Sequence, residues 1–230
     1  MRWQTRRKRP NKIALDQSEG KLTMLYPAFF DEIPGIRIRD PLAAFLGVSE
    51  DGVFEYRYLD AVKLAGHSCP TVAAAWNMTH LALASLYENE MPCRGNIRVA
   101  LHRNFDEGVT GVIASVVSLI TGAAAEGGFK GIAGQFQRQN LMRFNTEIPL
   151  ELRFSRQDMA KTVDVACDMS SIPTDPEMPR LLRECLDGNG SSAARHRFGV
   201  LWQERVRCLL LEHGNDPRVF IVRTNSDSLI

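Results

Sequence analysis

The spacing of hydrophobic residues predicts a few long helices. The stretch from Pro70 to Tyr87 is rich in alanine and leucine, and a helix tolerates proline in its first turn. Residues 106–122 are apolar almost all round, which predicts a helix buried on most sides. Residues 192–214 carry an apolar stripe at helical spacing, and the shorter runs 40–48 and 176–188 each end at a glycine or just beyond one.

Alternation with a period of two predicts strands between these helices. It is clearest in residues 96–103, where Ile97, Val99 and Leu101 share one face. Further strand candidates are residues 52–59, 141–144, 148–156, 162–169 and 218–223. Strands and helices do not alternate regularly as in parallel β/α proteins. The expected fold is therefore α+β, with a mixed or antiparallel sheet packed against a few long helices.

Length and charge suggest how the chain is organised. Its 230 residues suffice for one core with an appended subdomain. The opening MRWQTRRKRPNK is strongly basic without apolar periodicity, so residues 1–24 are expected to form a flexible basic arm. Residues 25–155 are expected to form the α+β core, and residues 156–230 a C-terminal extension packed on it. The net charge of +1 argues against a general affinity for nucleic acid.

The sequence favours a cytoplasmic location and offers no membrane span. No apolar run follows the basic opening as in a signal peptide, and none approaches the ~20 residues that cross a bilayer. Five cysteines at irregular spacings suggest reduced thiols, with Cys167 and Cys208 as core fillers. His80, His196 and His213 lie on predicted helices without an evident thiol or acidic partner, so they are expected on the surface or in packing contacts.

The segment GHSCP places His67 and Cys69 directly before the helix that begins at Pro70. An imidazole and a thiolate two residues apart can bind one divalent transition metal, with zinc favoured and nickel or iron as alternatives. His102, at the end of a predicted strand, is the candidate third ligand. In the alternative interpretation, His67 satisfies backbone groups of the turn and Cys69 packs in the core. A nucleophilic cysteine–histidine pair is a further alternative.

Two carboxylates and a glycine-rich segment could complete a small-molecule site. Glu107 precedes the second long helix, where a carboxylate can cap the helix or bind metal. If the protein is an enzyme, Glu107 or Glu126 is available as general base beside a Lewis-acidic metal. Gly127, Gly128 and Lys130 are expected near a polar ligand, although the glycines follow a helix and do not match a phosphate-binding loop.

GHSCP, followed by MPCRGNIRVAL and EGVTGVIASVVSLITGAAAEGGFKG, resembles the FmdE family of formylmethanofuran dehydrogenase subunits over about residues 55–145. The resemblance implies an α+β core, an intertwined homodimer and a transition-metal site using His67 and Cys69. The family takes its name from a complex of one-carbon metabolism. Further cysteines found in many members are replaced here by NFDEG and TGAAA, so Glu107 could substitute as a ligand.

The sequence therefore predicts a dimeric metal-binding protein with a small-molecule site at His67 and Cys69, covered by the glycine-rich segment. An alternative is a non-catalytic accessory or regulatory protein whose basic arm binds an acidic partner or nucleic acid.

Overall fold

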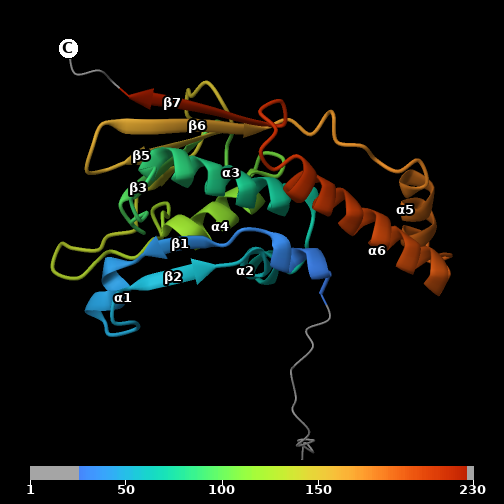
Figure 1. The fold of residues 1–230 in the computed structure, drawn as a ribbon, viewed down its shortest axis with the longest axis horizontal. Coiled ribbons are helices and arrows are strands. Elements are labelled where there is room, and N and C mark those ends of the chain that lie inside the picture. The colour runs from blue at the N-terminus through green and yellow to red at the C-terminus, as the bar shows by residue number, and fades with distance from the viewer. Residues whose placement is uncertain (1–25, 227–230) are drawn as a thin grey trace, which may run out of the picture.

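The computed structural model describes residues 26–226, arranged in three layers (Figure 1). A five-stranded sheet forms one layer, and helices α3 (Pro70–Tyr87) and α4 (Thr110–Thr121) form the middle layer. The third layer contains the antiparallel pair β1 (Ile36–Arg39) and β2 (Val53–Tyr56) together with helix α2 (Tyr58–Ala65). The predicted α+β fold is confirmed. The expected basic arm, residues 1–24, lies outside the described residues.

The main sheet is mixed, as predicted. Its strand order is β4-β3-β5-β6-β7, with β3 and β4 parallel and the other neighbours antiparallel. The strands are β3 (Ile97–Leu101), β4 (Met142–Arg143), β5 (Leu152–Arg156), β6 (Lys161–Cys167) and β7 (Phe220–Ser226). The domain boundary expected after residue 155 falls inside β5, and β6 and β7 extend the same sheet beyond it.

Helix α3 is the centre of the core, because it is apolar around most of its circumference and is covered on both sides. One side packs on β5, β6 and β7, and the other contacts α2 and α4. Trp76 is 1% exposed, and the nearby residues Ala73, Ala75 and Met78 are also buried. Such a helix loses contact with water on both sides only when elements from both halves of the chain have assembled around it.

The turn before α1 (Pro41–Phe45) is held by Asp40, one of the few buried carboxylates. Its side chain accepts hydrogen bonds from the backbone N–H groups of Leu42 and Ala43, which caps the helix. The same carboxylate binds Arg94 at 2.9 Å and Arg138 at 2.6 Å. Asp40 therefore ties the third layer to the loop between α3 and β3, through Arg94, and to the segment between α4 and β4, through Arg138. A 3₁₀-helix, η1 (Ala28–Glu32), precedes this region.

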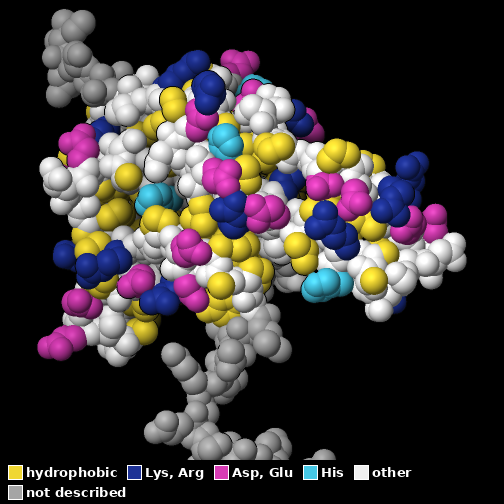
Figure 2. Space-filling model, turned by 45° about the vertical axis from the view of Figure 1, so that its right-hand side comes forward, with side chains coloured by type: hydrophobic (Ala, Val, Ile, Leu, Met, Phe, Trp, Pro, Cys, Tyr) yellow, Lys and Arg dark blue, Asp and Glu magenta, His cyan; other side chains and the backbone are white. Residues whose placement is uncertain are grey.

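The C-terminal helices project from the body of the molecule (Figure 1). Helix α5 (Met178–Leu186) packs on α6 (Ser192–Arg207) around a small cluster of Met178, Leu181 and Leu201. Helix α6 continues as a π-helical turn, η2 (Cys208–Glu212), whose Leu209 and Leu210 return to the main core. Figure 2 shows acidic and basic side chains interspersed over these helices. Within residues 26–226, none of the helices has the length and apolarity needed to cross a bilayer.

Candidate functional site

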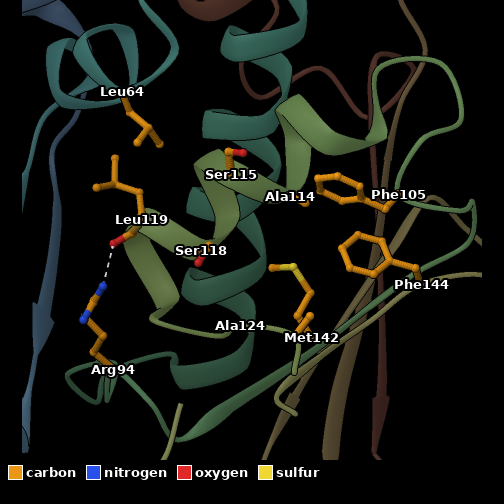
Figure 3. A pocket seen from close by; sticks show the side chains of 11 residues that line it. Leu64, Arg94, Phe105, Ala114, Ser115, Ser118, Leu119, Ala124, Met142 and Phe144 are labelled. Carbon is orange, nitrogen blue, oxygen red and sulfur yellow. Dashed lines mark hydrogen bonds between the residues drawn. The ribbon is translucent and has the colours of Figure 1, made fainter. Parts of the chain in front are cut away.

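An open groove lies between α2 and α4 and is here called the α2–α4 groove. Its volume is about 720 Å³, and most of its walls are apolar. Figure 3 shows Leu64 of α2 facing Leu119 of α4 on one side, with Phe105, Phe144 and Met142 on the other. Ala124 and Ala125 from the glycine-rich segment form part of the wall. Cavities of this size and character are typical of small-molecule sites.

The polar atoms of the α2–α4 groove are few. Ser115 and Ser118 contribute hydroxyl groups from α4, and Arg94 contributes its guanidinium. Arg94 donates to the carbonyls of Leu119 and Ile120 as well as to Asp40, so three of its five N–H groups are used by these partners. The side chain of Arg94 remains 22% exposed. This end of the groove can therefore offer further donors to a bound group.

Asp40, Arg94 and Arg138 together carry one net positive charge. One carboxylate binds two guanidinium groups, and the side chains of Asp40 and Arg138 are only 5% and 7% exposed. A charge in such surroundings is screened less than a surface charge. The electrostatic potential at the Arg94 end of the α2–α4 groove is therefore expected to favour an anion.

A second cavity of about 500 Å³ adjoins the α2–α4 groove and shares Leu64, Phe105 and Ser115 with it. His67 and Asp106 both line this cavity. An imidazole and a carboxylate beside an apolar groove can bind a polar group or transfer a proton. Of the residues that the sequence singled out as metal ligands, His67 is thus the one that reaches this region.

The segment that contains His67 is firmly positioned. Gly66 ends α2 with a φ of 74°, in the left-handed conformation that glycine adopts readily. The carbonyl of Ser68 accepts hydrogen bonds from Trp202 and Gln203 of α6. Cys69 then caps α3, since its sulfur accepts a hydrogen bond from the N–H of Val72 at 3.4 Å.

His67 and Cys69 have different surroundings. The Nδ1 atom of His67 lies 2.9 Å from the carbonyl oxygen of Ala65, and the imidazole is exposed. Cys69 is 8% exposed and belongs to the hydrophobic core. These are the contacts expected from the alternative in which His67 satisfies the backbone and Cys69 packs. Ligation of one metal by both residues stays a prediction.

His102 is exposed and lines a different cavity, with Glu151 and Cys167. Burial raises the pKa of Cys167 to about 12, and the neighbouring carboxylate of Glu151 acts in the same direction. Burial also raises the pKa of Glu151. Both effects disfavour the thiolate form of Cys167, which is the nucleophilic form. In residues 26–226, His67, Cys69 and His102 do not form a group of three adjacent ligands.

The other predicted site residues surround the groove rather than line it. Glu107 is exposed and lies 3.5 Å from Arg103, with which it forms a surface ion pair. Glu126 and Lys130 are exposed on the glycine-rich segment, next to the wall formed by Ala124 and Ala125. Their roles in catalysis and ligand binding stay predictions.

Gly127 and Gly128 provide a matched test of the glycine-rich segment. A Cβ atom on Gly128 would lie 2.7 Å from the Cβ of Ala124 and from backbone atoms of Gln139, whereas one on Gly127 would meet nothing within 4 Å. We expect Gly128→Ala to lower the free energy of unfolding by ~1–3 kcal/mol, because the wall of the groove must shift. Gly127→Ala should change it by less than ~0.5 kcal/mol. Urea denaturation of both variants checks this, and equal stabilities would contradict it.

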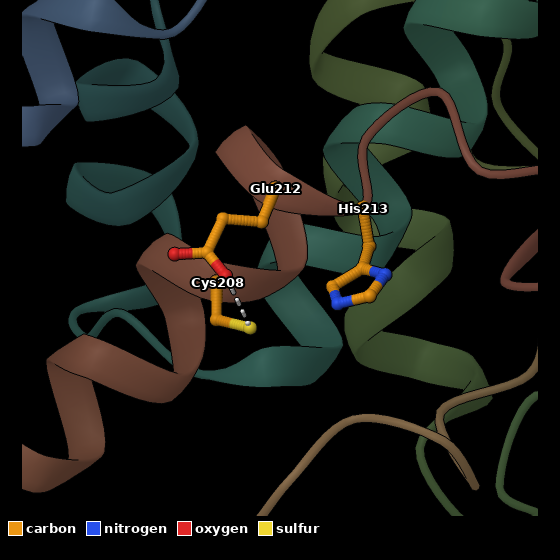
Figure 4. A group of neighbouring side chains, drawn as sticks. All are labelled: Cys208, Glu212 and His213. Atoms are coloured by element: carbon orange, nitrogen blue, oxygen red, sulfur yellow. Dashed lines mark hydrogen bonds between the residues drawn. The ribbon is translucent and has the colours of Figure 1, made fainter.

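A separate group of side chains, Cys208, Glu212 and His213, could hold a metal ion. One ligand atom from each residue lies within 4.8 Å of the others. Figure 4 shows all three on the π-helical turn η2 and the residue that follows it. Cys208 is buried, His213 is partly buried and Glu212 is exposed.

The sequence pattern did not indicate this group. His213 was expected to lack a thiol or acidic partner, but Glu212 precedes it and Cys208 lies five residues earlier. The spacing C-x-x-x-E-H was the available signal. In an ordinary α-helix residues five positions apart lie on different faces, ~140° apart, so this spacing does not by itself indicate a site.

Neither a protein-family model nor a curated protein matches this chain.

Proposed function

We propose that the protein binds a small molecule with an apolar body and one acidic group in the α2–α4 groove. The observation that carries this proposal is the groove itself, with its volume of about 720 Å³ and its mainly apolar wall. Burying an apolar surface there is favourable by ~25 cal/mol per Å². The net positive charge shared by Arg94, Arg138 and Asp40 supports an anionic group at that end.

The adjoining cavity supports a chemical role in addition to binding. His67 and Asp106 line it, and it shares the wall residues Leu64, Phe105 and Ser115 with the α2–α4 groove. A ligand held by its apolar body in the α2–α4 groove would bring its far end to this imidazole and carboxylate. We propose that they act there as proton donor and acceptor, with Glu126 as a further candidate base.

The homodimer and the metal-dependent activity implied by the family resemblance are part of this proposal. Leu64 and Phe105, at the rim of the groove, are 49% and 57% exposed, and large exposed apolar side chains are common at interfaces. Sedimentation equilibrium of the full chain tests the dimer. The transition metal is proposed to be zinc, which thiolate and imidazole ligands favour.

Anilinonaphthalene sulfonate is a suitable probe of the α2–α4 groove, because it combines an apolar aromatic body with an anionic group. We expect Ser118→Phe to weaken its binding by at least ~10-fold, because the added ring would occupy space in the groove that Ser118 lines. A tenfold change corresponds to ~1.4 kcal/mol of binding free energy. Lys63→Phe on α2 is the matched control, since Lys63 is exposed and does not line the groove. Fluorescence titration measures both.

The neutral probe N-phenylnaphthylamine separates the apolar contribution from the charge. The sulfonate should bind more tightly than the neutral probe at low salt, and the difference should shrink at high salt, where charges are screened. If Ser118→Phe and Lys63→Phe change the affinity for the sulfonate equally, the α2–α4 groove is not the binding site. Tighter binding of the neutral probe at every salt concentration would refute the anionic group.

A further inference from the structure

We propose that Cys208, Glu212 and His213 form a zinc site on the π-helical turn η2, separate from the α2–α4 groove. Neither the sequence prediction nor the proposed function includes this site. Three features support it: the geometry of the turn, the orientation of the imidazole and the contacts that hold both against the core.

The π-helical turn is what brings the three residues together. The N–H of His213 donates to the carbonyl of Cys208 at 3.1 Å, a bond from residue i+5 to residue i. This wider turn places both Glu212 and His213 beneath Cys208, whereas a regular α-helix would turn His213 ~140° away from it. Single π-turns within α-helices are frequent at functional sites. The π-helical end of α6 therefore brings three possible metal ligands together.

The ligand atoms are nearly close enough for coordination. The sulfur of Cys208 lies 3.4 Å from Oε2 of Glu212, and all three ligand atoms lie within 4.8 Å of one another. Neighbouring ligands of a tetrahedral zinc ion are about 3.3–3.8 Å apart, given metal–ligand bonds of ~2.0–2.3 Å. The ligand atoms must therefore approach one another by about 1 Å when the metal binds.

The imidazole of His213 is oriented as in a metal site. Its Nδ1 atom lies 3.3 Å from Oδ2 of Asp216, and Figure 4 shows the other ring nitrogen on the side of Cys208. The guanidinium of Arg218 donates to both oxygens of Asp216, at 3.1 and 2.9 Å, and so holds this carboxylate in place beside the imidazole. A carboxylate that accepts from Nδ1–H leaves Nε2 unprotonated and available to a metal. The Asp216 contact is thus the second, independent observation that supports a ligand at this place.

Glu212 retains an oxygen for the metal. Arg207 contacts its Oε1 atom, while Oε2 faces the sulfur of Cys208. A carboxylate can accept from an arginine through one oxygen and coordinate a metal through the other. The thiolate and the carboxylate together would balance the two positive charges of the ion.

The core holds the turn in place. The side chain of Asn77 on α3 donates to the carbonyl of Gly214 at 2.7 Å, directly after His213. Leu209 is fully buried and Leu210 nearly so, and both leucines anchor the turn in the main core. Ligands on such a rigid support need little ordering when the metal binds.

The chemistry of the donors favours a transition metal such as zinc over magnesium or calcium. One sulfur, one nitrogen and one oxygen exclude the all-oxygen sites that magnesium and calcium prefer. Three protein ligands leave a fourth position for water or a small anion, as in zinc sites with exchangeable ligands. Cobalt(II), which occupies zinc sites, reports thiolate ligation through its near-ultraviolet absorption.

The test uses the full chain, reduced and freed of metal, titrated with zinc in competition with a chromophoric chelator and separately with cobalt(II). We expect one zinc per chain that depends on Cys208, and a cobalt–thiolate absorption band from this site. Cys208→Ser should remove that contribution to the band and lower zinc affinity at this site by more than ~100-fold. Asp216→Asn should keep the band but lower zinc affinity by ~10–100-fold, as the loss of an orienting partner does. Circular dichroism without metal confirms that each variant folds.

Cys185→Ser and His196→Gln are matched controls, since Cys185 and His196 lie outside the group of three. Both should bind zinc as the original chain does. Loss of the cobalt band in Cys69→Ser but not in Cys208→Ser would overturn the proposal and support the site expected from GHSCP. Absence of zinc binding by the original chain, or equal binding by Cys208→Ser, would also overturn it. Probe binding in the α2–α4 groove is measured without metal and does not depend on these outcomes.

Discussion

Replacing Asp40 with asparagine is expected to lower the free energy of unfolding by ~3 kcal/mol or more. The side chain of Arg138 is 7% exposed and its guanidinium binds Asp40 at 2.6 Å, so Asp40→Asn leaves a buried cation without its counterion. Arg94 is more exposed and can gain compensating contacts with water. Asparagine caps a helix about as well as aspartate does, so the cap on α1 should survive. The loss of stability then measures the effect of removing the negative charge.

Glu177→Gln is the control for this measurement. Glu177 is exposed and lies 3.1 Å from Arg197, so removing its charge should cost less than ~1 kcal/mol. Urea denaturation followed by circular dichroism gives both values. If Asp40→Asn is no more destabilising than Glu177→Gln, the carboxylate does not compensate the buried guanidinium group of Arg138.

Replacing Trp76 with alanine is expected to destabilise the fold by ~3–5 kcal/mol. Trp76 is 1% exposed on the central helix, and its ring lies 6.1 Å from that of Tyr58 in an edge-on arrangement. Tyr58 in turn contacts Phe30 at 5.0 Å between ring centroids. The substitution would leave a cavity between α3, α2 and η1 that the surrounding backbone cannot fill.

Leu186→Ala provides the comparison for Trp76→Ala. Leu186 is 75% exposed at the end of α5, so its truncation should change the stability by less than ~0.5 kcal/mol. Thermal and urea unfolding of both variants measure the difference. A loss below ~1 kcal/mol for Trp76→Ala would mean that α3 is not the centre of one close-packed core.

Most elements could be predicted from the sequence because their signals are local. The apolar run after Pro70 forms α3, and the alternation around Val99 forms β3 with its apolar face buried. The start of α2 was less clear. Residues 52–59 were predicted as a strand, but the strand ends at Tyr56, the helix begins at Tyr58, and Asp60 accepts a hydrogen bond from the N–H of Arg57. The two residues of this bond are only three positions apart, so the signal is local. Arginine, however, is an unusual residue at the N-cap position of a helix.

The candidate sites were harder to predict because they depend on contacts between distant segments. GHSCP identified His67, which does line a cavity, but nothing in the sequence shows that the neighbouring wall comes from Phe105 and Ser115. The net charge at Arg94 arises from residues 40, 94 and 138, which are brought together only by the fold. The Cys208 group needed a π-helical turn, and a helical pattern in the sequence does not distinguish that turn from a regular α-helix.

The placement of α3 against β5, β6 and β7 also affects how the chain can fold during synthesis. The helix ends at Tyr87, but the strands that cover it lie between Leu152 and Ser226. A ribosome-bound chain that has reached residue 150 therefore carries a strongly apolar helix without its cover. Because contacts between distant segments form slowly, we expect the nascent chain to depend on chaperones until its last strand has emerged.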